Sequence, residues 1–330
     1  MKVLPKELLE AYQKRNVLVT GAGGFVGSSL VKALSEVDCT IYRLARGSLE
    51  PVSGKAQVQD RAGDMEKPDT WCDIIPKVDT VFHFAAQTST YVAAENPLAD
   101  MRVNVGGMIH LLEALRKAGT KPTILFSGTV TQVGMPEDLP VDESFPDVPV
   151  TLYDLSKLTA ERYLKYYCGE EWIRGACLRL SNVYGPTRVS SKEDRGILNK
   201  IVRMALAEEP LSVFDGGKFM RDYIFIDDVV AAFLYAGANA EKINGRHFVI
   251  SSGKGVTLKE AFQTAVDQVT RKTGKKMTIA DRDRPPGFSL IETRNFIGNP
   301  SAFIEATGWQ PRFSLEEGLS CTVDSIAATD

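Results

Sequence analysis

The stretch Val17-Leu18-Val19-Thr20-Gly21-Ala22-Gly23-Gly24-Phe25-Val26-Gly27 decides the fold of this 330-residue chain. An apolar run precedes a glycine-rich turn, and a helical pattern of apolar residues follows from Leu30. Glycines permit the tight turn, the close approach of backbone to a pyrophosphate and close packing of helix on strand, while the helix N-terminus faces the anion. We therefore expect a dinucleotide site formed by Gly21, Gly23, Gly24, Phe25, Val26 and Gly27.

Strand-like and helix-like segments alternate over the first part of the chain. Strands are expected at 17–20, 40–44, 80–84, 123–127 and 176–180. Alternation of this kind indicates an α/β fold, a Rossmann-type doubly wound parallel sheet with helices on both faces. A short helix is expected within residues 1–15, and another at 197–207 after a polar stretch.

A second motif is Tyr153-Asp154-Leu155-Ser156-Lys157. Residues four apart share one face of a helix, so the ammonium of Lys157 can lower the pKa of the Tyr153 phenol and make tyrosinate an accessible base. The spacing alone is common by chance and gains its meaning from the glycine-rich stretch before it. Together the two motifs predict hydride transfer to or from a bound nicotinamide.

With these motifs the chain resembles the extended short-chain dehydrogenase/reductase family of nucleotide-sugar epimerases, dehydratases and reductases. The family's loop reads Thr-Gly-x-x-Gly-Phe-x-Gly, as residues 20–27 do. Further segments match in order almost to the C-terminus: Gly63-Asp64-Met65, His83-Phe84-Ala85-Ala86-Gln87, Asn104-Val105-Gly106-Gly107, Phe126-Ser127-Gly128-Thr129, the segment 179–186, Arg221-Asp222-Tyr223 and Asp227-Asp228-Val229.

The resemblance implies roles for particular residues. Tyr153 would take the proton of a sugar hydroxyl, Lys157 would stabilise the tyrosinate, and Thr129 would hydrogen-bond the reacting oxygen. Residues expected at the cofactor, besides the glycine-rich turn, Tyr153 and Lys157, are Arg46, Ser48, Asp64, Met65, Phe84, Ala85, Ala86, Asn104, Ser127 and Leu180. Residues expected at the substrate are Gln87, Thr88, Ser89, Thr129, Asn182, Arg221 and Arg284, the two arginines holding the diphosphate.

Plainer structural roles stay open for three of these residues. The Thr129 hydroxyl can satisfy backbone groups at a strand end, and Asn182 can cap a turn. Arg284 can be a solvated loop arginine, because Arg282 lies beside it in the sequence.

The resemblance also implies a domain division and an oligomer. Residues 1–186 and 222–251 would form the NAD(P)-binding domain, and 187–221 and 252–330 a cap that binds the nucleotide sugar. Family members commonly pair through two helices, here within 98–118 and 153–168. Leu111, Leu112, Leu115, Leu158, Tyr163 and Tyr166 are the candidates for this homodimer interface, although the same residues can instead face the sheet.

Two departures from the family pattern bear on the reaction. Sugar 4,6-dehydratases carry an Asp-Glu pair where this chain has Val130 and Thr131, so dehydration, which needs a second acid and base, is disfavoured. At the end of the second strand, where an acidic residue would bind the ribose of NAD, Ala45 is followed by Arg46. Arg46 with Ser48 favours NADP slightly over NAD, unless Arg46 stacks on adenine or faces solvent.

Composition sets further bounds. A net charge of −3 gives no basic face for nucleic acid, and no apolar stretch reaches membrane-spanning length. The five cysteines show no paired spacing and read as packing residues in a reducing compartment, so we expect a cytoplasmic protein without a signal peptide. The three histidines are far apart in the sequence, and no metal is expected.

Three functions fit these observations. A nucleotide-sugar epimerase, which family prevalence favours, would oxidise a sugar carbon, expected to be C4, and return the hydride to the other face of the ketone. A nucleotide-sugar 4-ketoreductase would use the same residues in one direction and consume NADPH, which Arg46 suits. A non-catalytic cofactor-binding scaffold or sensor is disfavoured, because Thr129, Tyr153 and Lys157 are all present.

Overall fold

Seven parallel strands form the main sheet within the residues that the computed structural model describes, which are 4–186, 196–284 and 288–328. The sheet order is β3 (Gln57–Ala62), β2 (Thr40–Ala45), β1 (Asn16–Thr20), β4 (Thr80–His83), β5 (Thr123–Thr129), β6 (Arg174–Leu180) and β10 (His247–Ile250). The order reverses direction between β1 and β4, and such a switch point places ligands at the carboxyl ends of the strands. The predicted Rossmann-type fold is confirmed.

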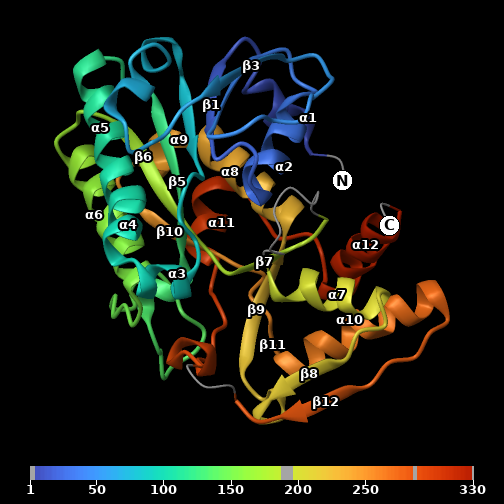
Figure 1. Cartoon of the computed structure of the whole chain (residues 1–330). Coiled ribbons are helices and arrows are strands. Elements are labelled where there is room, and N and C mark those ends of the chain that lie inside the picture. Colours follow the sequence, from blue (N-terminus) through green and yellow to red (C-terminus); the bar gives the residue numbers. More distant parts are fainter. Residues whose placement is uncertain (1–3, 187–195, 285–287, 329–330) are drawn as a thin grey trace.

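Helices cover both faces of this sheet (Figure 1). Helices α5 (Gly107–Ala118) and α6 (Leu152–Gly169) pack on one face, and α2 (Phe25–Leu34) and α8 (Ile226–Ala238) on the other. Side chains of β1 alternate accordingly, since Val17 and Val19 join the core with α2 and α8, whereas Leu18 joins the core with α5 and α6. Shorter helices are α1 (Lys6–Glu10), α3 (Thr90–Glu95), α4 (Pro97–Met101), α9 (Ala240–Ile243) and α11 (Ser301–Thr307).

A smaller part of the chain packs beside the sheet (Figure 1). Its helices α7 (Ile197–Leu206), α10 (Leu258–Thr273) and α12 (Leu315–Ala327) lie against one another. Strands β7 (Asn182–Tyr184), β9 (Met220–Phe225) and β11 (Gly255–Thr257) form one small sheet, and β8 (Leu211–Phe214) pairs with β12 (Ile279–Arg282). One apolar core runs without a break from β1 through α8 to α7, α10 and α12.

Short helical turns connect the larger elements. Turns of 3-10 type occur at Pro68–Trp71, Ile75–Lys77, Val130–Val133, Asp215–Gly217 and Leu290–Thr293. A π-turn at Arg102–Gly106 joins α4 to α5, and turns of this kind are frequent at functional sites.

Candidate active site

The glycine-rich turn is pressed against the end of β4. Gly21 has a φ of +64°, and a Cβ there would lie 2.8 Å from the backbone nitrogen of Ala85. A Cβ on Gly27 would lie 2.3 Å from the carbonyl oxygen of Gly21. A side chain at either position would force the backbone to move. Gly24 is the N-cap of α2, so the turn has the geometry that the expected pyrophosphate site requires.

The Thr20 hydroxyl ties this turn to the segment after β4. It accepts hydrogen bonds from the backbone N–H groups of Phe84 and Ala85, both at 3.1 Å, and lies 2.9 Å from Nδ1 of His83. Burial, helped by the charge of Lys157, lowers the pKa of His83 to about 3, so the imidazole is neutral and Thr20 donates to Nδ1. The backbone at 84–86, expected along the cofactor, is therefore held in place.

Tyr153 and Lys157 lie in the first turns of α6. The Thr151 side chain caps this helix by accepting a hydrogen bond from the Asp154 N–H. Lys157 is 2% exposed, and its Nζ lies 4.0 Å from the centroid of the Phe126 ring. Burial lowers the pKa of Lys157 to about 8, so this ammonium is poised to change charge near neutral pH. Tyr153 is half-buried and lines a cavity described below.

Thr129 ends β5 and begins the turn at Val130–Val133. Its hydroxyl accepts a hydrogen bond from the Thr131 N–H at 3.3 Å and lies 2.9 Å from the Thr131 hydroxyl, which donates to Asp154. The Thr129 N–H donates to Oε1 of Gln132 at 3.1 Å. Thr129 thus has the capping role that was its plainer alternative; of the two threonines it is Thr131 that lines the cavity containing Tyr153.

Behind Thr129 lies a buried ion-pair cluster. Gln132 donates to Glu161 at 2.9 Å, and Arg179 donates to both carboxylate oxygens of Glu161 at 2.8 Å. Arg179 also donates to Asp147 at 2.6 Å, and Lys165 to Glu161 at 2.6 Å. Because Gln132 binds both Thr129 and Glu161, this cluster fixes the end of β5 relative to α6.

A cavity of about 410 Å³ contains Tyr153 on its wall. Arg221 and Arg294 give this wall positive charge, which suits the phosphates of a nucleotide sugar. The cavity is lined by Thr88, Ser89, Thr90, Tyr91, Thr131, Tyr153, Asn182, Gly196, Arg221, Ile291, Glu292 and Arg294.

The two cavity arginines are buried and adjacent. Arg221 is 3% exposed and donates to the carbonyl oxygens of Met220 at 3.0 Å, Glu292 at 2.7 Å and Arg294. Burial lowers the pKa of Arg294 to about 10, and the nearby charge of Arg221 adds to this effect. The Nε of Arg294 is buried and has no hydrogen-bond partner among the described residues. Two neighbouring cations with an unused donor suit an anionic group.

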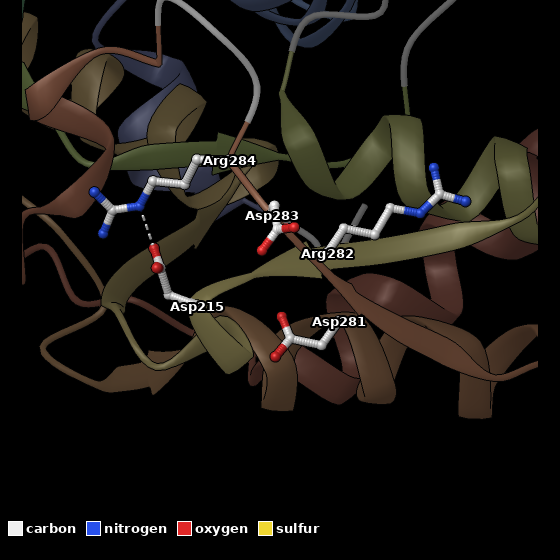
Figure 2. A pocket seen from close by; sticks show the side chains of 5 residues that line it. All are labelled: Asp215, Asp281, Arg282, Asp283 and Arg284. Carbon is white, nitrogen blue, oxygen red and sulfur yellow. Dashed lines mark hydrogen bonds and ion pairs between the residues drawn. The ribbon is translucent and has the colours of Figure 1, made fainter.

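Arg284 does not line the Tyr153 cavity; Figure 2 shows it among the residues of the cavity that it does line. Its Nε binds Asp215 at 2.6 Å, and its guanidinium lies 5.4 Å from the centroid of the Phe288 ring. It lines a separate cavity of about 620 Å³ with Asp215, Asp281, Arg282 and Asp283. This position agrees with the plainer alternative for Arg284 and leaves its substrate role a prediction.

Four predicted residues meet beside the cavity. The Gln87 N–H donates to Oδ1 of Asn104 at 3.0 Å, and Nδ2 of Asn104 donates back to the Gln87 carbonyl at 3.0 Å. Both side-chain amides also donate to the buried Asp100 carboxylate, at 2.8 and 2.9 Å. These bonds hold the backbone at Gln87 in place, and the next two residues, Thr88 and Ser89, line the cavity.

The remaining predicted cofactor residues lie at or just beyond the carboxyl ends of β2, β3, β4, β5 and β6. Arg46 and Ser48 are exposed after β2, and Arg46 has no hydrogen bond or ion pair with another described residue. Asp64 accepts a hydrogen bond from the Glu66 N–H at 3.1 Å, and Met65 is buried in the core beside Gly107. The partly buried predicted positions are Phe84, Ala85, Ala86, Ser127 and Leu180.

Among the residues of this site that sequence reasoning missed, three carry polar or charged groups that bear on its chemistry. Arg294 carries no motif that distinguishes it from a surface arginine. Thr131 drew notice in the sequence only because dehydratases have an acidic residue at its position. Asp154 resembles an ordinary helix-start carboxylate, yet it is fully buried behind Thr131. Segment 288–293 reaches the cavity through Ile291 and Glu292, whereas 189–195 lies outside the described residues.

The described residues contain no group of three or more His, Cys, Asp or Glu side chains arranged to hold a metal ion. None of their helices is both long and apolar enough to cross a membrane. Of the five cysteines, Cys72 and Cys321 are exposed, so the packing role expected for all five is wrong for these two.

Residues 17–251 match the model of the NAD dependent epimerase/dehydratase family. The chain belongs to this family. It is 30% identical to the UDP-glucose 4-epimerase of Mycolicibacterium smegmatis over 318 residues, which cover 93% of this chain and 97% of that protein. It is 29% identical to the dTDP-D-glucose 4,6-dehydratase of Mus musculus over 333 residues, 94% of this chain and 88% of that protein.

A solved structure of the family is similar throughout. The UDP-glucose 4-epimerase of Thermotoga maritima, crystallised with UDP-glucose, has a TM-score of 0.84 and 30% identity, covering 95% of this chain and 99% of that one. This member of the epimerase/dehydratase family is therefore an NAD(P)-dependent enzyme of the extended short-chain dehydrogenase/reductase type, as its motifs predicted.

Proposed function

We propose that this enzyme is a nucleotide-sugar epimerase that acts at C4 through a keto-sugar intermediate. The observation that carries the proposal is the position of Tyr153, on the wall of the cavity and one helical turn from the buried Lys157. A bound nicotinamide would accept the hydride of the sugar carbon and return it. Tyr153 holds the proton of the reacting hydroxyl, and the Lys157 ammonium stabilises the phenolate.

Cavity charge supports a substrate with a diphosphate. Arg294 has an unused donor, and Arg221 lies beside it. The relatives named UDP-glucose 4-epimerase support a UDP-sugar and reaction at C4. Residues 187–221 and 252–330 are proposed as the cap over this substrate.

Dehydration is a weaker candidate despite the 29% identity with the mouse dehydratase. Water elimination needs an acid and a base beside the base for oxidation, and neither Val130 nor Thr131 carries the carboxyl group that dehydratases use for these steps. The carboxylate of Asp154 lies behind Thr131 and is not part of the cavity wall.

A 4-ketoreductase is the second candidate, and Arg46 favours it. The side chain is exposed beyond the end of β2, where it is available to a 2′-phosphate of NADPH. Arg46→Ala should weaken NADPH binding and leave NADH binding unchanged; equal effects on both would remove this argument for NADP. A scaffold or sensor without turnover is the least favoured function.

Native mass spectrometry distinguishes the candidates. The protein is measured before and after incubation with UDP-, GDP-, CDP- and dTDP-sugars, and the sugar product is analysed. Retained NAD or NADP with an isomerised sugar supports the epimerase. An empty site that takes up NADPH and oxidises it with a 4-keto sugar supports the reductase. Tyr153→Phe should abolish turnover in either case while cofactor binding persists, and full activity in that variant would refute the mechanism.

We also propose a homodimer, through an apolar set that overlaps only partly with the one the sequence suggested. Leu111, Leu112 and Leu115 are 0% exposed and face the sheet, which is the alternative left open for them, and Leu158 is buried as well. Tyr163 and Tyr166 stay candidates. Most of the exposed large apolar side chains lie on α3, α4 and α6, which contact one another: Tyr91, Val92, Leu98, Met101, Leu152, Leu155, Tyr163 and Tyr166. Such a surface suits a second copy of the chain. A monomeric mass by light scattering would refute this proposal.

A further inference from the structure

A chain of side-chain oxygens runs from Thr129 through Thr131 to Asp154. The two threonine hydroxyls are 2.9 Å apart, and the Thr131 hydroxyl donates to Oδ1 of Asp154. Thr131 lines the cavity that contains Tyr153, whereas Asp154 is 0% exposed. The other carboxylate oxygen of Asp154, Oδ2, is buried without a hydrogen-bond partner in the described part of the chain.

The Asp154 carboxylate, at the end of this series of hydrogen bonds, fixes the direction in which each hydroxyl donates. A carboxylate only accepts hydrogen bonds, so the proton of Thr131 points to Asp154. Thr131 must then accept from Thr129, because its own proton is already used. One lone pair of the Thr131 oxygen is left for the cavity, where it can accept a hydrogen bond from a substrate hydroxyl.

We propose that Thr131 is a second proton acceptor for the reacting hydroxyl and that Asp154 is the positioning residue that receives its proton. The inference rests on the proposed function. When the sugar carbon would give its hydride to a bound nicotinamide, the hydroxyl proton would pass to Oγ1 of Thr131, and the former Thr131 proton to Oδ1 of Asp154. The alcohol becomes a ketone, and the two electrons leave with the hydride. The reverse shift returns the proton when the ketone is reduced.

This shift also prepares the site for the ketone. After it, the Thr131 proton points into the cavity and can donate to the carbonyl oxygen, while Thr129 still donates to Thr131. An epimerase must handle the same oxygen in two configurations, so a second proton acceptor besides Tyr153 gives each configuration a partner.

The groups around Asp154 are compatible with this role. Burial raises the pKa of its carboxyl, whereas the hydroxyls of Thr131 and Thr151 and the charge of Arg294 oppose the increase. Arg294 in turn lies near Arg221, Glu292 and Tyr223. A carboxylate with only a helix-starting role is ordinarily at the surface, where water solvates both of its oxygens. Asp154 instead is buried, and its Oδ2 accepts no hydrogen bond from the described residues.

The test compares wild type with Thr131→Val, Thr131→Ser and Asp154→Asn in the epimerisation of UDP-glucose. Thr131→Val keeps the shape and removes the hydroxyl, and Thr131→Ser is its matched control. A positioned proton acceptor contributes about 10²–10⁴-fold, and Tyr153 retains part of this. We therefore expect kcat to fall roughly 10-fold to 100-fold in Thr131→Val and Asp154→Asn, and Thr131→Ser to stay near wild type.

The pH profile separates a proton role from a structural one. Wild-type kcat should fall on the acid side as Asp154 becomes protonated, and this acid limb should vanish in Thr131→Val and Asp154→Asn but persist in Thr131→Ser. If kcat of Thr131→Val and Asp154→Asn declined at low pH as it does in wild type, the proposal would be overturned, whatever the absolute rates of these variants.

A second measurement needs no turnover. In protein carrying ¹³C-labelled aspartate, assigned with Asp154→Asn, Thr131→Val should raise the pKa of Asp154, because the ionised form loses a donor. An unchanged titration would overturn the hydroxyl chain. If wild type converts no nucleotide sugar, the proposed function fails, and this titration still decides whether Thr131 binds Asp154.

Discussion

Arg179→Met should destabilise the protein by about 3 kcal/mol at neutral pH. Arg179 is 2% exposed and binds the fully buried Glu161 through two hydrogen bonds of 2.8 Å. Removal of one partner of a buried ion pair costs about 3–5 kcal/mol, because the other charge stays buried without compensation. The lower end applies here, since Lys165 and Gln132 still bind Glu161, at 2.6 and 2.9 Å.

The loss of stability should depend on pH with a definite sign. Burial would raise the pKa of Glu161, but the hydrogen bonds and charge of Arg179 outweigh it and hold the pKa well below the ordinary value of 4.5. In wild type the stabilisation is therefore present above pH 4.5 and lost as the pH falls. In Arg179→Met burial prevails and the pKa rises, so protonation relieves the defect. The difference between variant and wild type should be largest near neutral pH and shrink towards pH about 5.

The assay is urea unfolding followed by tryptophan fluorescence, at neutral pH and at pH about 5. Arg162→Met is the matched control, because Arg162 also pairs with Asp147, at 3.2 Å, but its side chain is 66% exposed. Exposed pairs contribute about 0–1 kcal/mol, so the control should stay close to wild type. A loss below about 1 kcal/mol in Arg179→Met, or a loss independent of pH, would refute the reasoning.

Three further changes test the site. Gly27→Ala should weaken NAD binding more than about 10-fold, or 1.4 kcal/mol, because the new Cβ would lie 2.3 Å from the Gly21 oxygen; calorimetric titration with unchanged affinity would contradict the close packing. Burial lowers the pKa of Lys157 to about 8, so the cation is lost above that pH, and kcat should decline as the pH rises through about 8; a profile flat to pH about 10 would show that Lys157 keeps its ordinary pKa. Arg294→Met should weaken UDP binding about 10-fold or more, as loss of a charged hydrogen bond predicts, whereas Arg284→Met should have little effect; the opposite order would place the diphosphate at Arg284.

Local sequence patterns were sufficient for five of the seven strands of the main sheet, but did not indicate β3 or β10. The apolar run before Gly21 and the spacing of Tyr153 and Lys157 are short-range features, and the structure places both motifs at the carboxyl edge of one parallel sheet. Hydrophobic alternation likewise indicated strands at β1, β2, β4, β5 and β6.

Contacts between distant segments were not predictable in the same way. Arg294 reaches the cavity because Arg221, 73 positions earlier, binds its carbonyl group, and no local pattern encodes that pairing. Asp154 is buried because the turn after β5 covers it with Thr131, 23 positions away. The leucines of α5 show the limit of helical periodicity, which identifies an apolar face but not whether a sheet or a second subunit covers it.

The unbroken apolar core from β1 to α12 has a mechanical consequence. Two lobes that close on a ligand like a hinge need a thin, polar contact between them, whereas here α8 and α10 share one packed interior. Rotation of the smaller part as a rigid body would open that interior to water. We therefore expect a ligand to be accommodated by rearrangement of surface segments, with the packed frame of the two parts unchanged.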